Sequence, residues 1–162
     1  TFTYGSMKIE LTETDTRPDE DNKDDTNAYS LKLGTCITKD PVVTVDAGTV
    51  DSWIFVKADK SSNFDNYMTF ELTADWQALD KDKYPGVYYT KTTKSEEEQK
   101  LWLLKDNAVK VKSDVTQEAL DKLAEAIEAD EEDYPEISFT AYAVQAFEVD
   151  TAEEAWKIAE NQ

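Results

Sequence analysis

Hydrophobic and polar residues alternate along most of this chain, and this pattern predicts β-strands. The alternation is clearest in residues 67–74, where Met68, Phe70 and Leu72 share one side of a pleat and threonine and glutamate take the other. Such a segment is typical of an antiparallel strand with one solvated face. Further short strands are predicted at residues 29–33, 41–45, 87–89, 101–104, 109–111 and 136–149.

Residues 50–58 have a different pattern, because both of their faces are apolar. Ile54 and Val56 lie on one face, and Trp53 and Phe55 lie on the other. A strand that is apolar on both faces is buried from both sides. We therefore expect this strand to be central.

Two segments have helical spacing instead. Residues 116–129 place Leu120 and Leu123 on one face behind a Thr116 cap, and Thr151 precedes Glu154 by three residues in a capping box. Many short strands with few helices indicate a mainly β protein. The predicted fold is a jelly-roll-like antiparallel β-sandwich with one or two short helices.

The first eleven residues read as a strand whose alternation changes phase at Gly5-Ser6. A flat strand cannot bury both apolar sets on one face, so a bulge or a change of sheet is expected there. A terminal strand must also find its hydrogen bonds far away in the sequence or on another molecule. Assembly is therefore the first functional hypothesis. The apolar positions are Phe2, Tyr4, Met7, Ile9 and Leu11.

The 162 residues are enough for one domain with a sizeable core. The chain has 36 acidic and 17 basic residues, giving a formal charge of -19. This charge repels nucleic acid and anionic membrane surfaces, so neither is expected as a partner. No apolar stretch is long enough to predict membrane insertion.

The chain has no histidine and one cysteine, Cys36. These numbers remove the usual zinc ligands and the usual general base at neutral pH. We therefore predict no catalytic residues and no enzyme activity, and no particular carboxylate pair stands out as a glycosidase site. Cys36 is expected to be a buried, inert thiol rather than a reactive or intermolecular one.

Two acidic segments, residues 13–25 and 128–133, are candidates for cation binding or for solvated loops. The first is rich in calcium-type oxygen ligands, but Lys23 interrupts the spacing and no turn glycine follows, so it is not an EF-hand. We favour a solvated loop over a weak calcium site, and no other cofactor is expected. The second segment is expected to be a loop after the first helix. The candidate calcium ligands are Asp19, Asp21, Asp24 and Asp25.

Large aromatic residues could form a carbohydrate platform or fill the core. In a β-sandwich such rings are more often core residues and strand-pair partners, and we favour that interpretation. The set comprises Trp53, Trp76, Trp102, Trp156, Tyr88 and Tyr89.

Several segments together resemble the TasA and camelysin family, secreted proteins of Gram-positive bacteria. Residues 1–11 are similar to the mature N-terminus of that family, and the other matches cover essentially the whole chain. They lie at residues 33–35, 37–41, 51–57, 86–89, 139–145 and 153–156.

The resemblance implies a secreted protein of the cell surface or extracellular matrix, with a jelly-roll domain at residues 13–162 and an N-terminal donor strand at residues 1–12. The five apolar residues of that strand would be the donor anchors of a head-to-tail homopolymer. An accessory anchoring protein or a matrix polysaccharide are further candidate partners.

Two alternative functions stay open. Camelysin-like members have been described as surface metallopeptidases, but this chain has no His-Glu-x-x-His helix. The other alternative is a monomeric adhesin or fibre-anchoring module.

Overall fold

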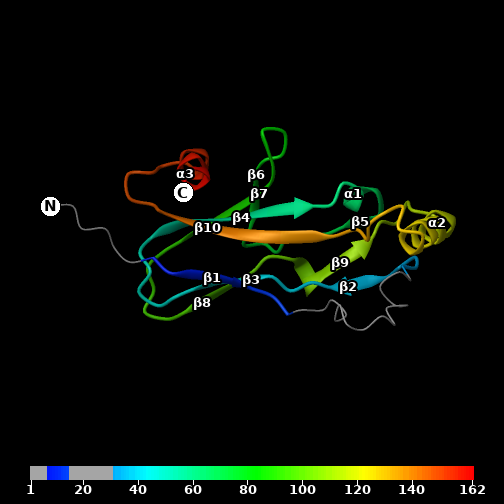
Figure 1. The fold of residues 1–162 in the computed structure, drawn as a ribbon. Helices are drawn as coiled ribbons and strands as arrows, with labels where there is room; N and C mark the ends of the chain where they lie inside the picture. Colours follow the sequence, from blue (N-terminus) through cyan, green and yellow to red (C-terminus); the bar gives the residue numbers. More distant parts are fainter. Residues whose placement is uncertain (1–6, 15–30) are drawn as a thin grey trace.

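The computed structural model describes residues 7–14 and 31–162 of the chain (Figure 1). The described residues form a mainly β protein, with antiparallel strands in three sheets. The strands are β1 (Ile9–Thr12), β2 (Cys36–Thr38), β3 (Val42–Val45), β4 (Ser52–Lys60), β5 (Met68–Thr69), β6 (Gln77–Asp80), β7 (Tyr84–Thr92), β8 (Gln99–Trp102), β9 (Ala108–Val111) and β10 (Ile137–Gln145). The helices are α1 (Phe64–Tyr67), α2 (Gln117–Glu128) and α3 (Ala152–Glu160), with a 3-10 turn at Lys105–Asn107.

The strands make two layers. One layer is the four-stranded sheet β10-β4-β7-β6, and the other consists of two three-stranded sheets, β1-β3-β8 and β2-β9-β5. Figure 1 shows the β1-β3-β8 sheet near one end of the larger sheet and β2 and β9 near the other end. The prediction of an antiparallel β-sandwich with short helices is confirmed.

Strand β4 is the centre of the larger sheet, as its two-faced apolar pattern predicted. It pairs along its full length with β10 and on its other side with β7. Its first five residues, from Ser52 to Val56, are all buried. Alternate residues of one strand therefore serve two separate cores.

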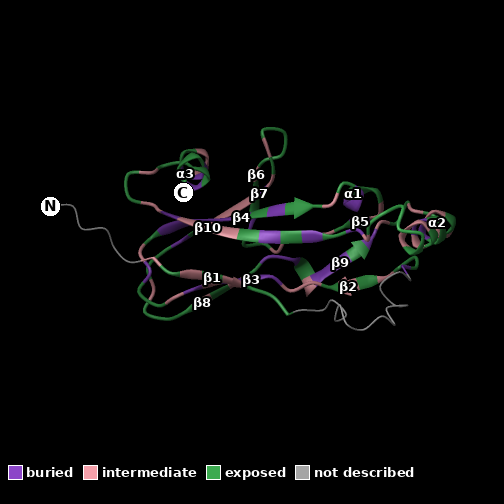
Figure 2. Cartoon of the chain, viewed as in Figure 1, coloured by how far each residue is buried: buried purple, intermediate pink, exposed green. Residues whose placement is uncertain are grey.

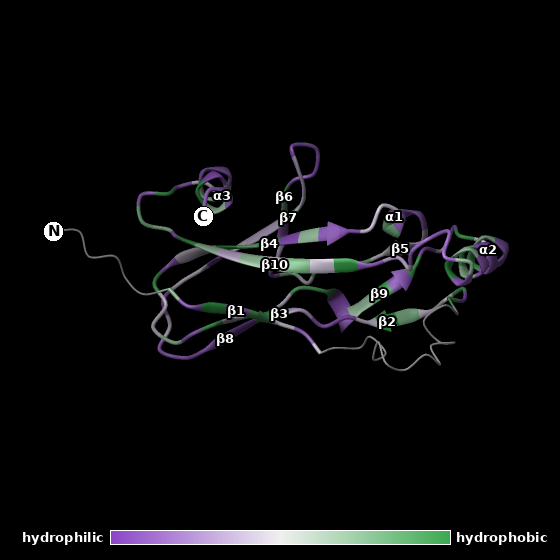
Figure 3. Cartoon of the chain, viewed as in Figure 1, coloured by the Kyte–Doolittle hydropathy of each residue, from purple (hydrophilic) through white to green (hydrophobic). Residues whose placement is uncertain are grey.

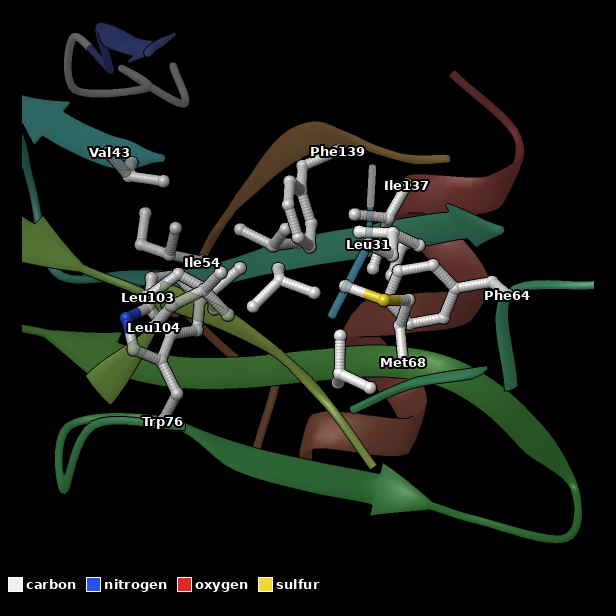
Figure 4. Close-up of a cluster of buried hydrophobic side chains, with 14 of the residues drawn as sticks. Leu31, Val43, Ile54, Phe64, Met68, Trp76, Leu103, Leu104, Ile137 and Phe139 are labelled. Atoms are coloured by element: carbon white, nitrogen blue, oxygen red, sulfur yellow. The ribbon is translucent and has the colours of Figure 1, made fainter. Parts of the chain in front are cut away.

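The main core fills the space between the layers. Ile54 and Val56 of β4 face Val43 and Val45 of β3, and all four are almost completely buried. Figure 4 shows this cluster, with side chains contributed from both layers. Its labelled members are Leu31, Val43, Ile54, Phe64, Met68, Trp76, Leu103, Leu104, Ile137 and Phe139.

A second core lies on the other face of β4, under α3. The ring of Trp156 lies 5.2 Å from that of Phe55 and 5.3 Å from that of Tyr142, measured between centroids. Trp53 belongs to the same cluster, and its indole N–H donates to the Val149 carbonyl at 2.9 Å. The C-terminal helix therefore forms a third layer on the sandwich.

Both predicted helices are confirmed. The Thr116 hydroxyl accepts the Ala119 N–H at 3.1 Å, and Leu120 and Leu123 are the buried residues of α2. Thr151 caps α3 by accepting the Glu154 N–H at 3.2 Å. Helix α2 ends at Glu128, so the acidic segment 128–133 is largely a loop, as expected.

The strand predicted at residues 67–74 is mostly wrong. Strand β5 ends at Thr69, and beyond it Leu72 makes only an isolated bridge to Leu104. Phe70 and Leu72 nevertheless pack against the main core. The alternation therefore predicted which side chains point inward, but it could not show that the backbone lacks a continuous partner strand.

The strand predicted at residues 29–33 is also absent from the part that the structure describes. Leu31 is buried, but residues 31–35 form a turn in which Thr35 N–H donates to the Lys32 carbonyl at 3.1 Å. The turn leaves Leu33 exposed. Strand β6 and helix α1, in contrast, had no counterpart in the sequence-based prediction.

Candidate functional site

The N-terminal segment becomes a strand of the chain's own sandwich at Ile9. Ile9 lies opposite Val45 and Leu11 lies opposite Val43 in antiparallel register. Both side chains are half-buried and pack against the main core. Figure 3 shows β1 in hydrophobic colour at the edge of its sheet.

The five expected donor anchors therefore fall into two groups. Ile9 and Leu11 lie in the chain's own sheet, and Met7 is half-buried just before it. Phe2 and Tyr4 lie outside the described residues. We expected a donor strand at residues 1–12 and a domain at residues 13–162. In the structure, Ile9–Thr12 pairs within the sandwich, so the sandwich includes β1 as well.

Polar contacts hold the beginning of β1 in place. The Asp46 N–H donates to the Lys8 carbonyl at 2.9 Å, and the Lys8 N–H donates to the Thr49 hydroxyl at 3.3 Å. The Lys8 ammonium also lies 3.6 Å from the Asp46 carboxylate, although this pair is exposed and contributes little. The backbone contacts fix the point at which the chain enters the sheet.

A second set of contacts holds the end of β1. The backbone N–H and the hydroxyl of Thr14 each donate to the Asp40 carboxylate at 2.8 Å. The hydrogen bond from the Thr14 hydroxyl, followed by that from its N–H, lowers the pKa of Asp40. Lys39 pairs with Glu13 at 3.2 Å. Residues 8–14 are therefore attached at both ends.

Strand β10 presents a long free backbone edge. Ser61 N–H donates to the Glu136 carbonyl, and Ala146 N–H donates to the Asp51 carbonyl, so even-numbered residues of β10 face β4. Because hydrogen-bonding direction alternates along an antiparallel strand, odd-numbered residues face away from it. No hydrogen bond within residues 7–14 and 31–162 joins the outward backbone groups of Ile137, Phe139, Ala141 and Ala143.

The free edges of β10 and β1 lie near each other. Lys8 bonds to Asp46, so the backbone groups of Ile9 and Leu11 point away from β3 by the same alternation. Cα atoms of β1 and β10 approach within 8 Å. Strand β10 has nine residues and β1 has four, so β1 is too short to lie along the whole β10 edge. Figure 2 shows buried and exposed residues alternating along β10.

The candidate calcium ligands Asp19, Asp21, Asp24 and Asp25 lie outside the described residues. Within the ranges 7–14 and 31–162, no group of three or more acidic, cysteine or histidine residues is arranged to hold a metal ion.

Cys36 is exposed, which corrects the expectation of a buried thiol. It lies on β2 opposite Lys110, and its neighbour Ile37 is half-buried against the main core. Because side chains alternate between faces, Ile37 pointing inward requires Cys36 to point outward.

The core interpretation of the aromatic residues is correct for three of the four tryptophans. Trp53, Trp76 and Trp156 are 8%, 4% and 3% exposed, whereas Trp102 is 41% exposed. Tyr88 packs against the main core, where burial raises its pKa, and Tyr89 packs against the second core.

Sequence reasoning missed the polar contacts that attach elements to one another. Lys83 and the Tyr84 hydroxyl both contact the Glu153 carboxylate, at 2.6 Å and 3.2 Å, and so connect the β6-β7 hairpin to α3. The hydrogen bond from Lys83 is the main cause of the lowered pKa of Glu153. Nothing in the local sequence connects residues about 70 positions apart.

Comparisons with known proteins return no match: no family model, no curated protein and no solved structure is similar to this chain. Among the described residues, no helix is both long enough and apolar enough to cross a membrane.

Proposed function

We propose that this protein is the structural subunit of an extracellular filament, and that copies join head to tail when one copy adds its N-terminal residues as a strand to the next. The observation that carries this proposal is the free edge of β10. The backbone N–H and C=O groups of its odd-numbered residues from 137 to 143 face outward without a partner in the described part of the chain. Such an edge is a template for another strand.

The attachment of β1 defines which residues are available to donate. Contacts at Lys8 and at Thr14 fasten residues 8–14 to their own subunit. Residues 1–7 precede this attachment, and they include Phe2, Tyr4 and Met7. In this proposal Ile9 and Leu11 anchor the arm to its own subunit, and the three earlier apolar residues bind the neighbour.

The affinity available from this arm is substantial. Each apolar side chain that becomes fully buried contributes roughly 1.5–3 kcal/mol. Three anchors therefore contribute at most about 9 kcal/mol before the cost of ordering the arm is subtracted, and Met7 contributes less than a full share because it is already half-buried. Main-chain hydrogen bonds fix the register. One donor and one acceptor per chain make a heterologous contact, which extends into a filament when it does not close into a ring.

The secreted location and the matrix role rest on the resemblance of the sequence to the TasA and camelysin family. The charge of -19 is consistent with solubility of the free subunit.

The donor arm is tested by deletion of residues 1–6. This deletion leaves β1 and its contacts intact, whereas removal of residues 1–11 would also delete Ile9 and Leu11 from the main core. Negative-stain imaging and sedimentation should show filaments for the full chain and monomers for the shortened one. A peptide of residues 1–7 added to the full chain should cap the edge and reduce filament length. Filaments that form equally well without residues 1–6 would rule out the donor arm.

The acceptor edge is tested by a matched pair of proline substitutions. Ala141 has an outward N–H on the β10 edge, so Ala141→Pro removes a donor without removing a bond to β4. Ala78 is opposite Tyr88 on the other edge strand, β6, and Tyr88 bonds to β4, so Ala78 also has an outward N–H. Ala141→Pro should abolish filaments, and Ala78→Pro should not.

Thermal unfolding must confirm that both proline variants fold. If Ala141→Pro does not fold, Ala143→Pro is a second substitution on the same edge. Normal filaments from folded variants at both β10 positions would show that β10 is not the acceptor.

A further inference from the structure

The outer face of the β1-β3-β8 sheet carries a row of side chains that the core does not use. In this sheet Thr12 is opposite Val42, and Val42 is opposite Trp102. Their neighbours Leu11, Val43 and Leu101 point into the main core, so this row points to the other side. Helix α3 packs against the other sheet, so it does not cover this face.

Trp102 is held rigidly on this face, although its ring is exposed. Its neighbour Leu103 donates its N–H to the Pro41 carbonyl at 3.2 Å, which makes Val42 and Trp102 a non-hydrogen-bonded pair with close side chains. On the other side, the Thr73 hydroxyl donates to the Trp102 carbonyl at 2.6 Å. Val42 is only 8% exposed. The backbone of Trp102 is therefore held on both sides, and its ring lies beside Val42.

Polar groups surround the ring in a pocket of about 350 Å³. Among the described residues its lining includes Trp102 and Val42 together with Thr12, Glu13, Thr14, Asp40 and Lys100. The depression is open to solvent, so a ligand would lie on it and not inside an enclosed cavity. The pocket combines one flat apolar surface with both donors and acceptors at its rim.

Among the residues that the structure describes, the charges at this rim are nearly balanced. Glu13 is paired with Lys39 at 3.2 Å, and the lining also contains the Lys100 ammonium and the Asp40 carboxylate. The two Thr14 hydrogen bonds lower the pKa of Asp40, so this carboxylate is an acceptor at neutral pH. A ligand with a strong charge of either sign gains little in such a pocket.

We propose that this pocket binds one or two units of a neutral hexopyranose polysaccharide. The apolar face of a pyranose ring stacks on the Trp102 indole, and its hydroxyls bond to Asp40 and Lys100. Polyuronates are disfavoured by the overall charge of -19. Polyamines are disfavoured because the Glu13 carboxylate is already paired with Lys39. The site lies on a sheet face and not on the β10 edge, so binding does not depend on filament formation.

The test is a glycan array of neutral, uronate-bearing and amine-bearing oligosaccharides of several linkages, followed by titration calorimetry with the best neutral ligand. We expect binding to neutral oligosaccharides. Trp102→Ala should reduce the affinity roughly tenfold or more, because the stacking surface is lost. Ile158→Ala is the matched control, since Ile158 is 45% exposed on α3 and Trp102 is 41% exposed. It should bind as the unmodified protein does.

Tryptophan fluorescence gives an independent readout. Trp102 is the only exposed tryptophan of the four, so a bound sugar should shift the emission of the unmodified protein and leave that of Trp102→Ala unchanged. Absence of binding to every neutral glycan would overturn the proposal. So would equal affinity in Trp102→Ala, or preference for charged glycans. A Trp102→Ala variant that lost self-association but never bound glycan would instead assign the pocket to a second copy of the chain.

Discussion

Gly86 allows a sharp test of how closely β4 and β7 approach each other. Its φ is +79°, and a Cβ placed on it would lie 2.9 Å from the Ala58 carbonyl oxygen on β4. Gly48 has nearly the same φ, +81°, but a Cβ there would have no atom within 4 Å. Alanine at the two positions therefore has the same backbone cost but different steric consequences.

The magnitudes follow from these two geometries. A left-handed conformation costs an alanine about 1–2 kcal/mol, and the lower entropy of the unfolded chain offsets about half of that. Gly48→Ala should therefore lower the free energy of unfolding by about 0.5–1 kcal/mol. Gly86→Ala should lower the free energy of unfolding by roughly 1–3 kcal/mol more than Gly48→Ala does, because the backbone oxygen of a central strand must move.

The assay is urea unfolding of each variant at neutral pH, with the m value compared to confirm the same two-state transition. The difference between Gly86→Ala and Gly48→Ala isolates the close approach. Equal losses at the two positions, within about 0.5 kcal/mol, would refute the reasoning, because only the shared backbone term would then act.

Other predictions concern hydrogen bonds, pH and ions. Trp53→Phe should cost about 1 kcal/mol more than Trp76→Phe in urea unfolding, because the indole N–H of Trp53 is bonded and that of Trp76 is buried without a partner in the described residues. The pKa of Asp40 is lowered from 3.8 by folding, so the extra stability of the unmodified protein over Asp40→Asn should be fully present above that value. This extra stability should disappear as the pH falls through the lower pKa of the folded state. Urea unfolding midpoints of the two proteins, compared at neutral pH and at about pH 2, check this. Filament assembly, followed by light scattering, should be promoted by salt; promotion by calcium beyond that of magnesium at matched ionic strength would support a site in residues 13–25, and equal promotion would leave only screening.

The elements that could be predicted from the sequence are those whose signals are local. The N-cap residues Thr116 and Thr151 predict the helices that follow them, and the two-faced apolar pattern of residues 50–58 predicts a central strand. The prediction failed at residues 67–74, because alternation reports the direction of side chains and not the presence of a partner strand. It failed at Cys36, because Ile37 points into the main core and the neighbouring side chain must then point outward.

The candidate site could be predicted only in part. The alternation correctly places Ile9 and Leu11 on one face, against the main core, whereas the phase change at Gly5-Ser6 lies outside the described residues. The free edge of β10 could not be predicted, because it depends on β4 being its only hydrogen-bonded partner strand in the described part of the chain. The exposure of Trp102 likewise depends on strand pairing between residues about 60 positions apart, as Val42 and Trp102 are.

The arrangement of β4 between β10 and β7 has a consequence for the order of folding. Ser52 pairs with Thr92 and with Gln145, so the second partner is synthesised long after the first. Closing such long loops is slow, and a chain that depends on non-local pairing folds slowly. Until β10 arrives, Trp53, Ile54, Phe55 and Val56 form an apolar strand with one open side, which is the kind of segment that aggregates. The nascent chain should therefore depend on a chaperone to prevent aggregation during synthesis more than the folded protein does.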